Sequence, residues 1–238
     1  MTKRILIGYS CCPLTRSAFE QAGVEAWTCD LLPARDNSAR HLQCDVWEVA
    51  NDNWDMAVLH PMCTNLTISA AWAFNDPDFD RYPGVGYHQK VQDGTLTGAA
   101  RREARDRDIE NFRRLLALPY PKAIENPAGS FVSKAIRPAD QTVQPNWFGD
   151  DASKATGLWL DRLPRLRRGQ RAIGRLVDDG RAQLGLFGTG VERFDNQTDG
   201  GQNKLTPSAD RWLARSATYP GIAAAMGEQW GAFIKGLL

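Results

Sequence analysis

The sequence predicts an α/β protein built around a parallel sheet with crossover helices. Short apolar runs, bounded by small or polar residues, alternate along the chain with segments of helical periodicity. Polar side chains that suit chemistry follow directly after several of these runs, as expected at the carboxyl edge of an open parallel sheet. The chain has 238 residues, which is enough for one α/β domain with a sizeable core.

The first elements alternate between strand and helix. Residues 3–9 (KRILIGY) form a short apolar run that predicts a buried strand. Residues 14–22 (LTRSAFEQA) have a helical pattern, which Gly23 can end as a C-cap. Residues 24–30 (VEAWTCD) predict a second strand that ends in an acid.

Further strands are expected along the middle of the chain. Residues 41–46 (HLQCDV) contain the end of a third strand, and residues 54–61 (WDMAVLHP) contain a fourth, which Pro61 ends. Residues 121–127 (PKAIENP) and 155–160 (ATGLWL) predict two later strands. Strands joined by helices favour parallel pairing.

The remaining segments differ in character. Residues 65–95 are rich in Asn, Asp, Pro and Gly and predict a long loop with a short helix, and residues 98–118 predict a charged helix. Residues 161–205 are rich in Arg, Gly and Asp, which is typical of an insertion or a partly disordered segment. We therefore divide the chain into a core (1–160), an insert (161–205) and a C-terminal helical part (206–238) that returns to the core.

Composition excludes several classes of protein. Hydrophobic residues make up 42% of the chain and charged residues 24%, and no apolar run approaches the roughly 20 residues that a membrane-spanning helix needs. The opening MTKRILIGYS fits a core strand better than a signal peptide, so we expect a cytoplasmic protein that does not contact a membrane. The net charge of +1 does not indicate nucleic-acid binding.

The cysteines do not predict a disulfide framework or a metal site. Their number is odd, and no Cys-x-x-Cys pair occurs. The chain also has three histidines, which are scattered: His41, His60 and His88. We expect reduced thiols and no bound metal. The five cysteines all lie within the first 63 residues of the chain: Cys11, Cys12, Cys29, Cys44 and Cys63.

Arginines are concentrated near the start of the insert. Between Arg162 and Arg175 there are six arginines and no acidic residue. A solvated face explains them, and so does a patch that contacts phosphates. The six residues are Arg162, Arg165, Arg167, Arg168, Arg171 and Arg175.

The predicted strand ends carry the chemically useful residues. Asp30 ends the second strand 22 residues after Gly8, and an acid at this place commonly holds ribose hydroxyls. Each end taken alone has a plainer explanation, such as a helix cap, a turn or an inert buried thiol, but their order and spacing point to one site. The segments are Tyr9-Ser10-Cys11, Asp30, Asp45, His60 to Thr64, and Glu125-Asn126.

In this order the motifs resemble the cytosine-5 DNA methyltransferase family, in style its short, phage-type members. The segment LIGYSCCPLTRSAFEQAGVEAWTCD resembles the family's cofactor motif, HPMCT its proline-cysteine motif and ENP its Glu-Asn-Val. FGDDASKAT, NKLTP and YPGIAAAMGEQWG resemble later motifs. The resemblance implies a Rossmann-like S-adenosylmethionine-dependent methyltransferase sheet with helices on both faces and a reduced target-recognition segment. It also places the protein in a bacterium or a phage-infected cell.

The resemblance assigns roles residue by residue. S-adenosylmethionine is the implied cofactor, and its binding residues are Tyr9, Ser10, Cys11, Asp30, Leu31, Asp45 and His60. The implied catalytic residues are Cys63, Glu125, Asn126 and Lys154. The substrate-binding residues are Pro61, Thr64, Arg165, Arg167, Arg168 and Arg171.

Four departures from the family's pattern stand out. Cys11, Cys12 and Pro13 occupy the family's glycine-rich loop, and Met62 replaces the proline before the nucleophile. In the later basic motif, only Lys154 keeps a positive charge. The target-recognition domain is reduced to the insert.

The implied reaction is transfer of a methyl group to carbon 5 of cytosine in DNA. The thiolate of Cys63 would add to carbon 6 and make carbon 5 nucleophilic, while Glu125 holds the N3 edge of the base. Three alternatives stay open. The substrate could be a free nucleotide such as dCMP, or an amino nitrogen could be methylated, although HPMCT lacks the aromatic residue of that class. The chain could also be a non-catalytic relative that binds DNA.

Overall fold

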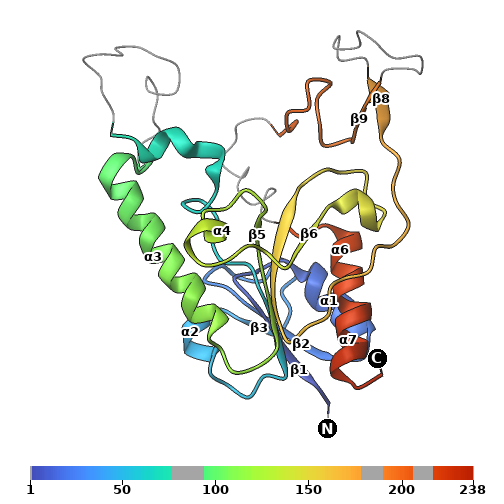
Figure 1. The fold of residues 1–238 in the computed structure, drawn as a ribbon. Helices are drawn as coiled ribbons and strands as arrows, with labels where there is room; N and C mark the ends of the chain where they lie inside the picture. Colours follow the sequence, from blue (N-terminus) through green and yellow to red (C-terminus); the bar gives the residue numbers. More distant parts are fainter. Residues whose placement is uncertain (1, 77–93, 178–189, 206–216, 238) are drawn as a thin grey trace.

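The computed structural model describes residues 2–76, 94–177, 190–205 and 217–237. Its centre is a seven-stranded sheet with the strand order β3-β2-β1-β4-β5-β7-β6 (Figure 1). Neighbouring strands from β3 to β5 pair in parallel, whereas β7 pairs antiparallel with both β5 and β6. The strands are β1 (Arg4–Gly8), β2 (Glu25–Cys29), β3 (His41–Leu42), β4 (Met56–Leu59), β5 (Lys122–Pro127), β6 (Gln141–Val143) and β7 (Thr156–Asp161).

Helices cover both faces of this sheet (Figure 1). On one face lie α2 (Val46–Val49), α3 (Gly98–Leu116) and α4 (Val132–Ala135). On the other lie α1 (Pro13–Gln21), α6 (Pro220–Ala225), the π-helical turn η4 (Met226–Trp230) and α7 (Gly231–Ile234). Short 3₁₀ helices, η1 (Ile68–Phe74) and η3 (Pro145–Phe148), lie in connections. The structure confirms the predicted α/β architecture, a Rossmann-like sheet with helices on both faces.

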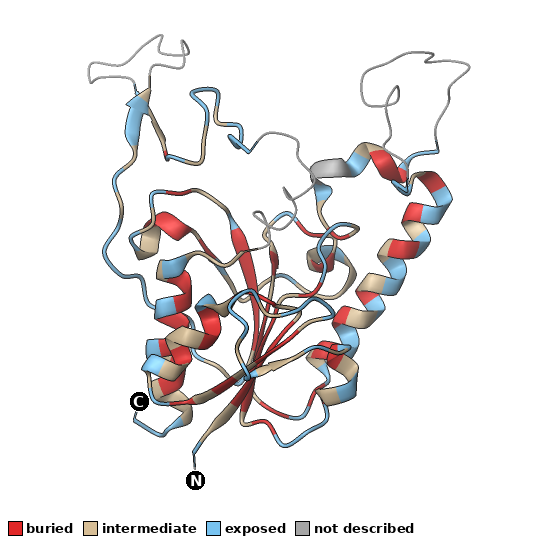
Figure 2. Ribbon diagram, turned by 180° about the vertical axis from the view of Figure 1, so that it is seen from behind, coloured by how far each residue is buried: buried red, intermediate tan, exposed pale blue. Residues whose placement is uncertain are grey.

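Alternation along the strands builds two cores, one on each face. In β1, Leu6 points to the face of α3, where it joins a cluster that includes Phe112. Ile5 and Ile7 point to the other face and join a cluster with Phe19 of α1 and Trp230 of η4. Figure 2 shows the central strands mostly buried and the helices buried along the side that faces the sheet. Burial from both faces explains why the central strands β1 and β4 are mainly apolar runs.

Local sequence sets the helix ends. Pro13 stands in the first turn of α1, and Gly23 follows the helix with φ +73°, as the predicted C-cap requires. The closing helix, predicted as one element, contains the π-helical turn η4. A Cβ on Gly227 in that turn would lie 2.4 Å from the carbonyl oxygen of Ala18, so only glycine allows this close approach to α1.

The insert forms a separate two-stranded sheet. β8 (Arg175–Val177) and β9 (Val191–Arg193) pair antiparallel, apart from the main sheet (Figure 1). Residues 178–189 of the insert, and residues 77–93 of the loop predicted over 65–95, lie outside the described residues.

Candidate active site

The carboxyl ends of β1, β4 and β5 lie side by side in the middle of the sheet. β4 pairs with both β1 and β5, and the amide of His60 just past β4 donates to the carbonyl of Gly8 at 3.0 Å. The sheet therefore brings together three of the segments singled out in the sequence: Tyr9–Cys11, His60–Thr64 and Glu125–Asn126.

Cys63 lies on an exposed turn that follows β4. Its carbonyl accepts hydrogen bonds from the amides of Leu66 and Thr67, both at 3.0 Å. Just before it, the carbonyl of Pro61 accepts a hydrogen bond from Nδ2 of Asn126 at 3.3 Å. Asn126 thus ties the turn to the end of β5.

A second clamp holds this turn from α3. Nη2 of Arg101 donates to the carbonyl of Thr64 at 2.6 Å, and Arg101 is only 6% exposed. Its guanidinium lies over the ring of Phe74, 5.2 Å from the centroid. Asn65 in the turn donates to Asp108 of α3 at 2.9 Å. These contacts were not predicted from the sequence, because a buried arginine in a strongly charged helix cannot be told apart from its exposed neighbours.

Glu125 is a buried carboxylate with cationic neighbours. Its Oε2 lies 3.3 Å from Nδ1 of His60. Burial is the largest influence and raises the pKa of Glu125, but the hydrogen bond from His60, the charge of Lys154 and a hydrogen bond from Thr156 together lower the pKa below its usual value. Glu125 is therefore ionised at neutral pH.

Two buried polar atoms at these strand ends have no partner among the described residues. They are Nε2 of His60 and Oδ1 of Asn126. Buried polar groups are nearly always hydrogen-bonded, so these atoms mark places that can receive polar groups of a ligand. A small cavity beside Glu125 is also lined by Lys154, Thr156, Thr218, Tyr219, Ile222 and Met226.

Tyr9 joins the end of β1 to α3. It has a left-handed backbone (φ 58°), and its hydroxyl lies 3.3 Å from Nδ2 of Asn111. Oδ1 of Asn111 also accepts a hydrogen bond from the indole of Trp47 at 2.9 Å. Burial raises the pKa of Tyr9, and the nearby charge of Asp45 raises it further. The side chains of β1, α2 and α3 therefore meet at this end of the sheet.

The two acids at the ends of β2 and β3 also bond locally. Oδ1 of Asp30 accepts from the amide of Leu32 at 2.9 Å, and Leu31 is exposed. Asp45 caps α2 by accepting from the amide of Trp47 at 2.9 Å, within a capping box that Glu48 completes. The sequence did not predict this helix, but a helix cap is the plainer explanation given above for an acid at a strand end.

The glycine-poor loop after β1 is compact. The amide of Cys12 donates to Oγ of Ser10 at 3.3 Å, and the carbonyl of Cys11 accepts from the amide of Arg35 at 3.1 Å. Both cysteines are buried. An adenosine group such as that of S-adenosylmethionine would need a stacking face and acceptors for its hydroxyl and amino groups, and Tyr9, Asp30 and Asp45 are residue types that can supply them. The methionine part would meet side chains here instead of bare backbone.

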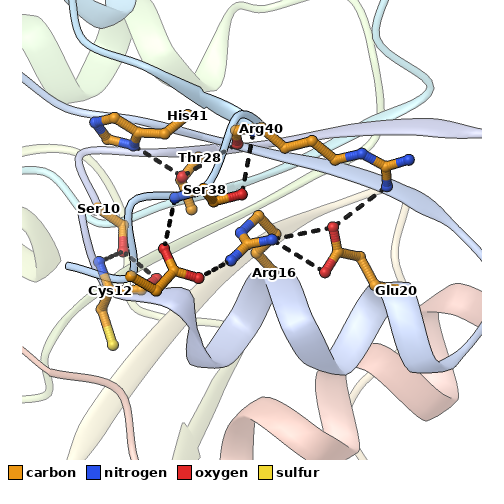
Figure 3. Close-up of polar contacts among 9 residues, drawn as sticks. Ser10, Cys12, Arg16, Glu20, Thr28, Ser38, Arg40 and His41 are labelled. Atoms are coloured by element: carbon orange, nitrogen blue, oxygen red, sulfur yellow. Dashed lines mark hydrogen bonds and ion pairs between the residues drawn. The ribbon is translucent and has the colours of Figure 1, made fainter. Parts of the chain in front are cut away.

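A charge network fixes the segment after β2 onto α1 (Figure 3). Nη1 of Arg16 donates to both carboxylate oxygens of Glu20 at 3.1 Å, and Nη2 pairs with Asp36. Arg40 also pairs with Glu20, at 3.3 Å. Arg16 is buried, so the network holds residues 36–40 beside the predicted cofactor loop. This network was not predicted from the sequence, because its partners lie up to 20 residues apart.

The arginines of the insert have several environments. Arg168 lies over the ring of Trp147, 3.6 Å from the centroid, while Arg165 and Arg167 are exposed. Three others form ion pairs with acids that are distant in sequence or directly adjacent: Arg162–Asp161, Arg171–Glu192 and Arg175–Asp199. The pairing reduces the positive charge that the sequence alone suggested.

The described part of the chain lacks a metal-binding cluster and a membrane-spanning helix. It contains no group of three or more His, Cys, Asp or Glu side chains arranged to hold a metal ion. No helix in it is long and apolar enough to cross a membrane.

Comparison with known proteins does not identify a family for this chain. No model of a protein family matches the chain, and no curated protein matches it. Among solved structures, the Dnmt2 methyltransferase of S. pombe is similar over 69% of this chain, with 14% identity and a TM-score of 0.38. This chain spans about half of that one, 51% of its length. Function is therefore inferred from the strand-end residues themselves.

Proposed function

We propose that this chain transfers a methyl group from S-adenosylmethionine to carbon 5 of cytosine through a covalent adduct of Cys63. One observation carries the proposal. An exposed thiol is fixed on a turn at the end of β4, and the end of the adjacent strand β5 supplies the buried, ionised Glu125. Addition of a thiol to a pyrimidine needs a nucleophile and also a second group that binds the ring nitrogen N3 as its charge changes.

Cys63 acts as the nucleophile. Carbon 5 of cytosine is too weak a nucleophile to take a methyl group directly, and addition of the thiolate to carbon 6 turns the ring into an enamine. The clamps on Pro61 and Thr64 hold the turn on both sides of Cys63, which supports its role, because an oriented nucleophile lowers the entropic part of the barrier. After transfer, loss of the proton on carbon 5 expels the thiolate.

Glu125 holds the edge of the base. Its carboxylate meets N3 and the 4-amino group, where charge changes as the thiol adds. Lys154, whose charge already acts on Glu125, favours the thiolate and the charged adduct. Asn126 positions the turn through Pro61.

S-adenosylmethionine, when bound, supplies the methyl group as an electrophile. We propose that Tyr9 stacks on its adenine and that Asp30 accepts from its ribose hydroxyls, with Asp45 beside the adenine amino group. Ser10, Cys11 and the exposed Leu31 complete this side. The ion pair between Arg16 and Asp36, and the hydrogen bond from the amide of Arg35 to the carbonyl of Cys11, support the proposal, because they fix the segment after β2 next to the loop after β1.

DNA is the proposed substrate. The base would have to leave the helix stack to reach Cys63, with Pro61 and Thr64 beside it. The exposed Arg165 and Arg167 can contact phosphates, and Arg168 and Arg171 would add to them.

One observation favours a second candidate, a free nucleotide such as dCMP. Three of the six arginines already pair with acids, which leaves fewer cations for a DNA backbone. A mononucleotide needs only one phosphate to be held.

The test is transfer of labelled methyl from S-adenosylmethionine to duplex DNA and, in parallel, to dCMP. Cys63→Ser should abolish transfer, whereas the matched thiol variant Cys44→Ser should retain it. Label on DNA, with affinity that falls steeply as salt rises, supports the DNA substrate. Label on dCMP alone supports the second candidate. Undiminished transfer by Cys63→Ser contradicts the covalent mechanism.

A further inference from the structure

The side chain of His60, just past β4, contacts the carboxylate of Glu125. Nδ1 of its imidazole lies 3.3 Å from Oε2 of Glu125, and its side chain is 8% exposed. The second ring nitrogen, Nε2, is buried and has no partner among the described residues. Sequence analysis assigned His60 to the cofactor, but its contact is with the group that would hold the base.

The proposed reaction needs a proton that Glu125 does not carry. When a thiolate adds to carbon 6 of cytosine, the electron pair it displaces ends on N3, which must take up a proton. Glu125 is ionised, because its neighbours keep its pKa low. A protonated imidazole next to the carboxylate can replace each proton that Glu125 delivers.

We propose that His60 holds this proton and passes it through Glu125 to N3 of the base, a role that rests on the proposed function. Nδ1–H of His60 faces the carboxylate. Nε2, on the other side of the ring, has no partner among the described residues and can form a hydrogen bond with the substrate or exchange a proton with water. His60 acts through Glu125: the carboxylate is ionised at rest and carries a proton only while it passes the proton from His60 to N3.

The proton and electron changes balance. In the first step the Sγ–C6 bond forms, the C5=C6 pair moves to C4–C5, the C4=N3 pair moves to N3, and N3 gains the proton that leaves Nδ1 of His60 through Glu125. S-adenosylmethionine, when bound, would supply the methyl group: the C4=C5 pair would bond to the methyl carbon, the methyl–sulfonium bond would break with its pair left on the donor's sulfur, and the N3 pair would form C4=N3 again. The proton on carbon 5 then leaves to solvent, its bonding pair forms C5=C6 again, and the Sγ–C6 bond breaks with its pair returning to Sγ. N3 then returns its proton through Glu125 to His60, so both residues end as they began.

The first test compares His60→Gln with the wild type. Glutamine keeps a hydrogen-bond donor for Glu125 but cannot carry the proton. The turnover number should fall at least ~100-fold, the lower range for general acid–base catalysis. The KM for the nucleic acid or nucleotide, and the Kd for S-adenosylmethionine measured by calorimetry, should stay unchanged. His41→Gln is the matched control, because His41 bonds to Thr28 and Leu32, away from Glu125.

The second test uses hydrogen exchange at carbon 5 of the base without S-adenosylmethionine. Addition of Cys63 makes carbon 5 basic, so the wild type should exchange tritium from that position with water. His60→Gln should lose exchange in parallel with transfer. A weaker cofactor Kd with normal exchange would return His60 to the cofactor site and overturn the proposal.

The third test is chemical rescue of His60→Ala. Added imidazole should restore exchange, whereas pyrazole, which has the same size but is a far weaker base, should not. Equal rescue by both azoles would show that His60 only fills space, and normal exchange in both His60 variants would also refute its role. If the wild type neither transfers nor exchanges, the proposed function itself fails and this role fails with it.

Discussion

Replacing Arg101 with methionine tests whether α3 holds the turn that carries Cys63. Methionine keeps most of the buried stem of the side chain over Phe74 but removes the guanidinium. The carbonyl of Thr64 then loses its donor at 2.6 Å, and the longer contact to the carbonyl of Leu96 at 3.5 Å disappears as well.

The size of the effect follows from these contacts. A hydrogen bond from a charged donor contributes about 1.5–3 kcal/mol. Arg101 is buried, so solvent screens this bond little, whereas Thr64 is exposed and its carbonyl can be hydrated in the variant. We expect the free energy of unfolding to fall by about 2–3 kcal/mol. For a domain of this size, Tm should fall by roughly 5–10 °C.

The assay is urea unfolding followed by tryptophan fluorescence, with methyl transfer measured well below the Tm of the variant. Transfer should fall at least ~10-fold, since small displacements of a reacting group are costly. Arg105→Met is the control, because Arg105 lies one turn further along α3 and shares the ring contact but not the bond to Thr64. Arg105 pairs at 2.9 Å with the exposed, adjacent Asp106, and its guanidinium lies 5.5 Å from the ring centroids of Phe74 and Phe131. Its loss should cost under ~1 kcal/mol. Equal stability and activity of the Arg101 and Arg105 variants would refute the clamp.

Three further predictions use the same structure. Gly227→Ala should lower the free energy of unfolding by about 1–3 kcal/mol or more in thermal unfolding, because its Cβ would lie 2.4 Å from the carbonyl oxygen of Ala18; wild-type stability would mean that α1 and η4 are further apart. The ionised Glu125 has a lowered pKa in the folded chain, so its stabilising contribution is present above about pH 4.5 and is lost as the pH falls further. The wild type should therefore lose stability relative to Glu125→Gln as the pH falls into the acid range. A difference in the free energy of unfolding that does not depend on pH would argue against the lowered pKa. Asp30→Ala should weaken S-adenosylmethionine binding in calorimetry and leave the unfolding curve nearly unchanged, and an unaltered Kd would remove Asp30 from the ribose.

The strong apolar runs were enough to predict most of the sheet. Residues 3–9, 24–30, 54–61, 121–127 and 155–160 all contain strands of the structure. β4 is buried along its whole length, and β1 and β7 along most of theirs, so their sequences are compact and mainly apolar. The short elements α2, α4 and β6 were not predicted, because three or four residues are too few to show a period.

The candidate site was predicted only where residues are close in sequence to a strand end. The edge of a parallel sheet collects such residues whatever the details of packing, which is why Glu125 and the Cys63 turn could be grouped. The partners of that edge come from elsewhere. Arg101 and Asn111 lie on α3, and their positions depend on how that helix packs on the sheet. Likewise, His60 gave no sign that its partner is Glu125, 65 residues away.

The central claim is a covalent bond between Cys63 and carbon 6 of cytosine. The most direct measurement is trapping with duplex DNA, or dCMP, that carries 5-fluorocytosine, in the presence of S-adenosylmethionine. Fluorine cannot leave carbon 5 as the proton does, so the adduct should persist and be found by peptide mass spectrometry on Cys63, in wild type and not in Cys63→Ser. An absence of adduct while methyl groups are still transferred to unmodified substrate, or an adduct on another cysteine, would contradict the account.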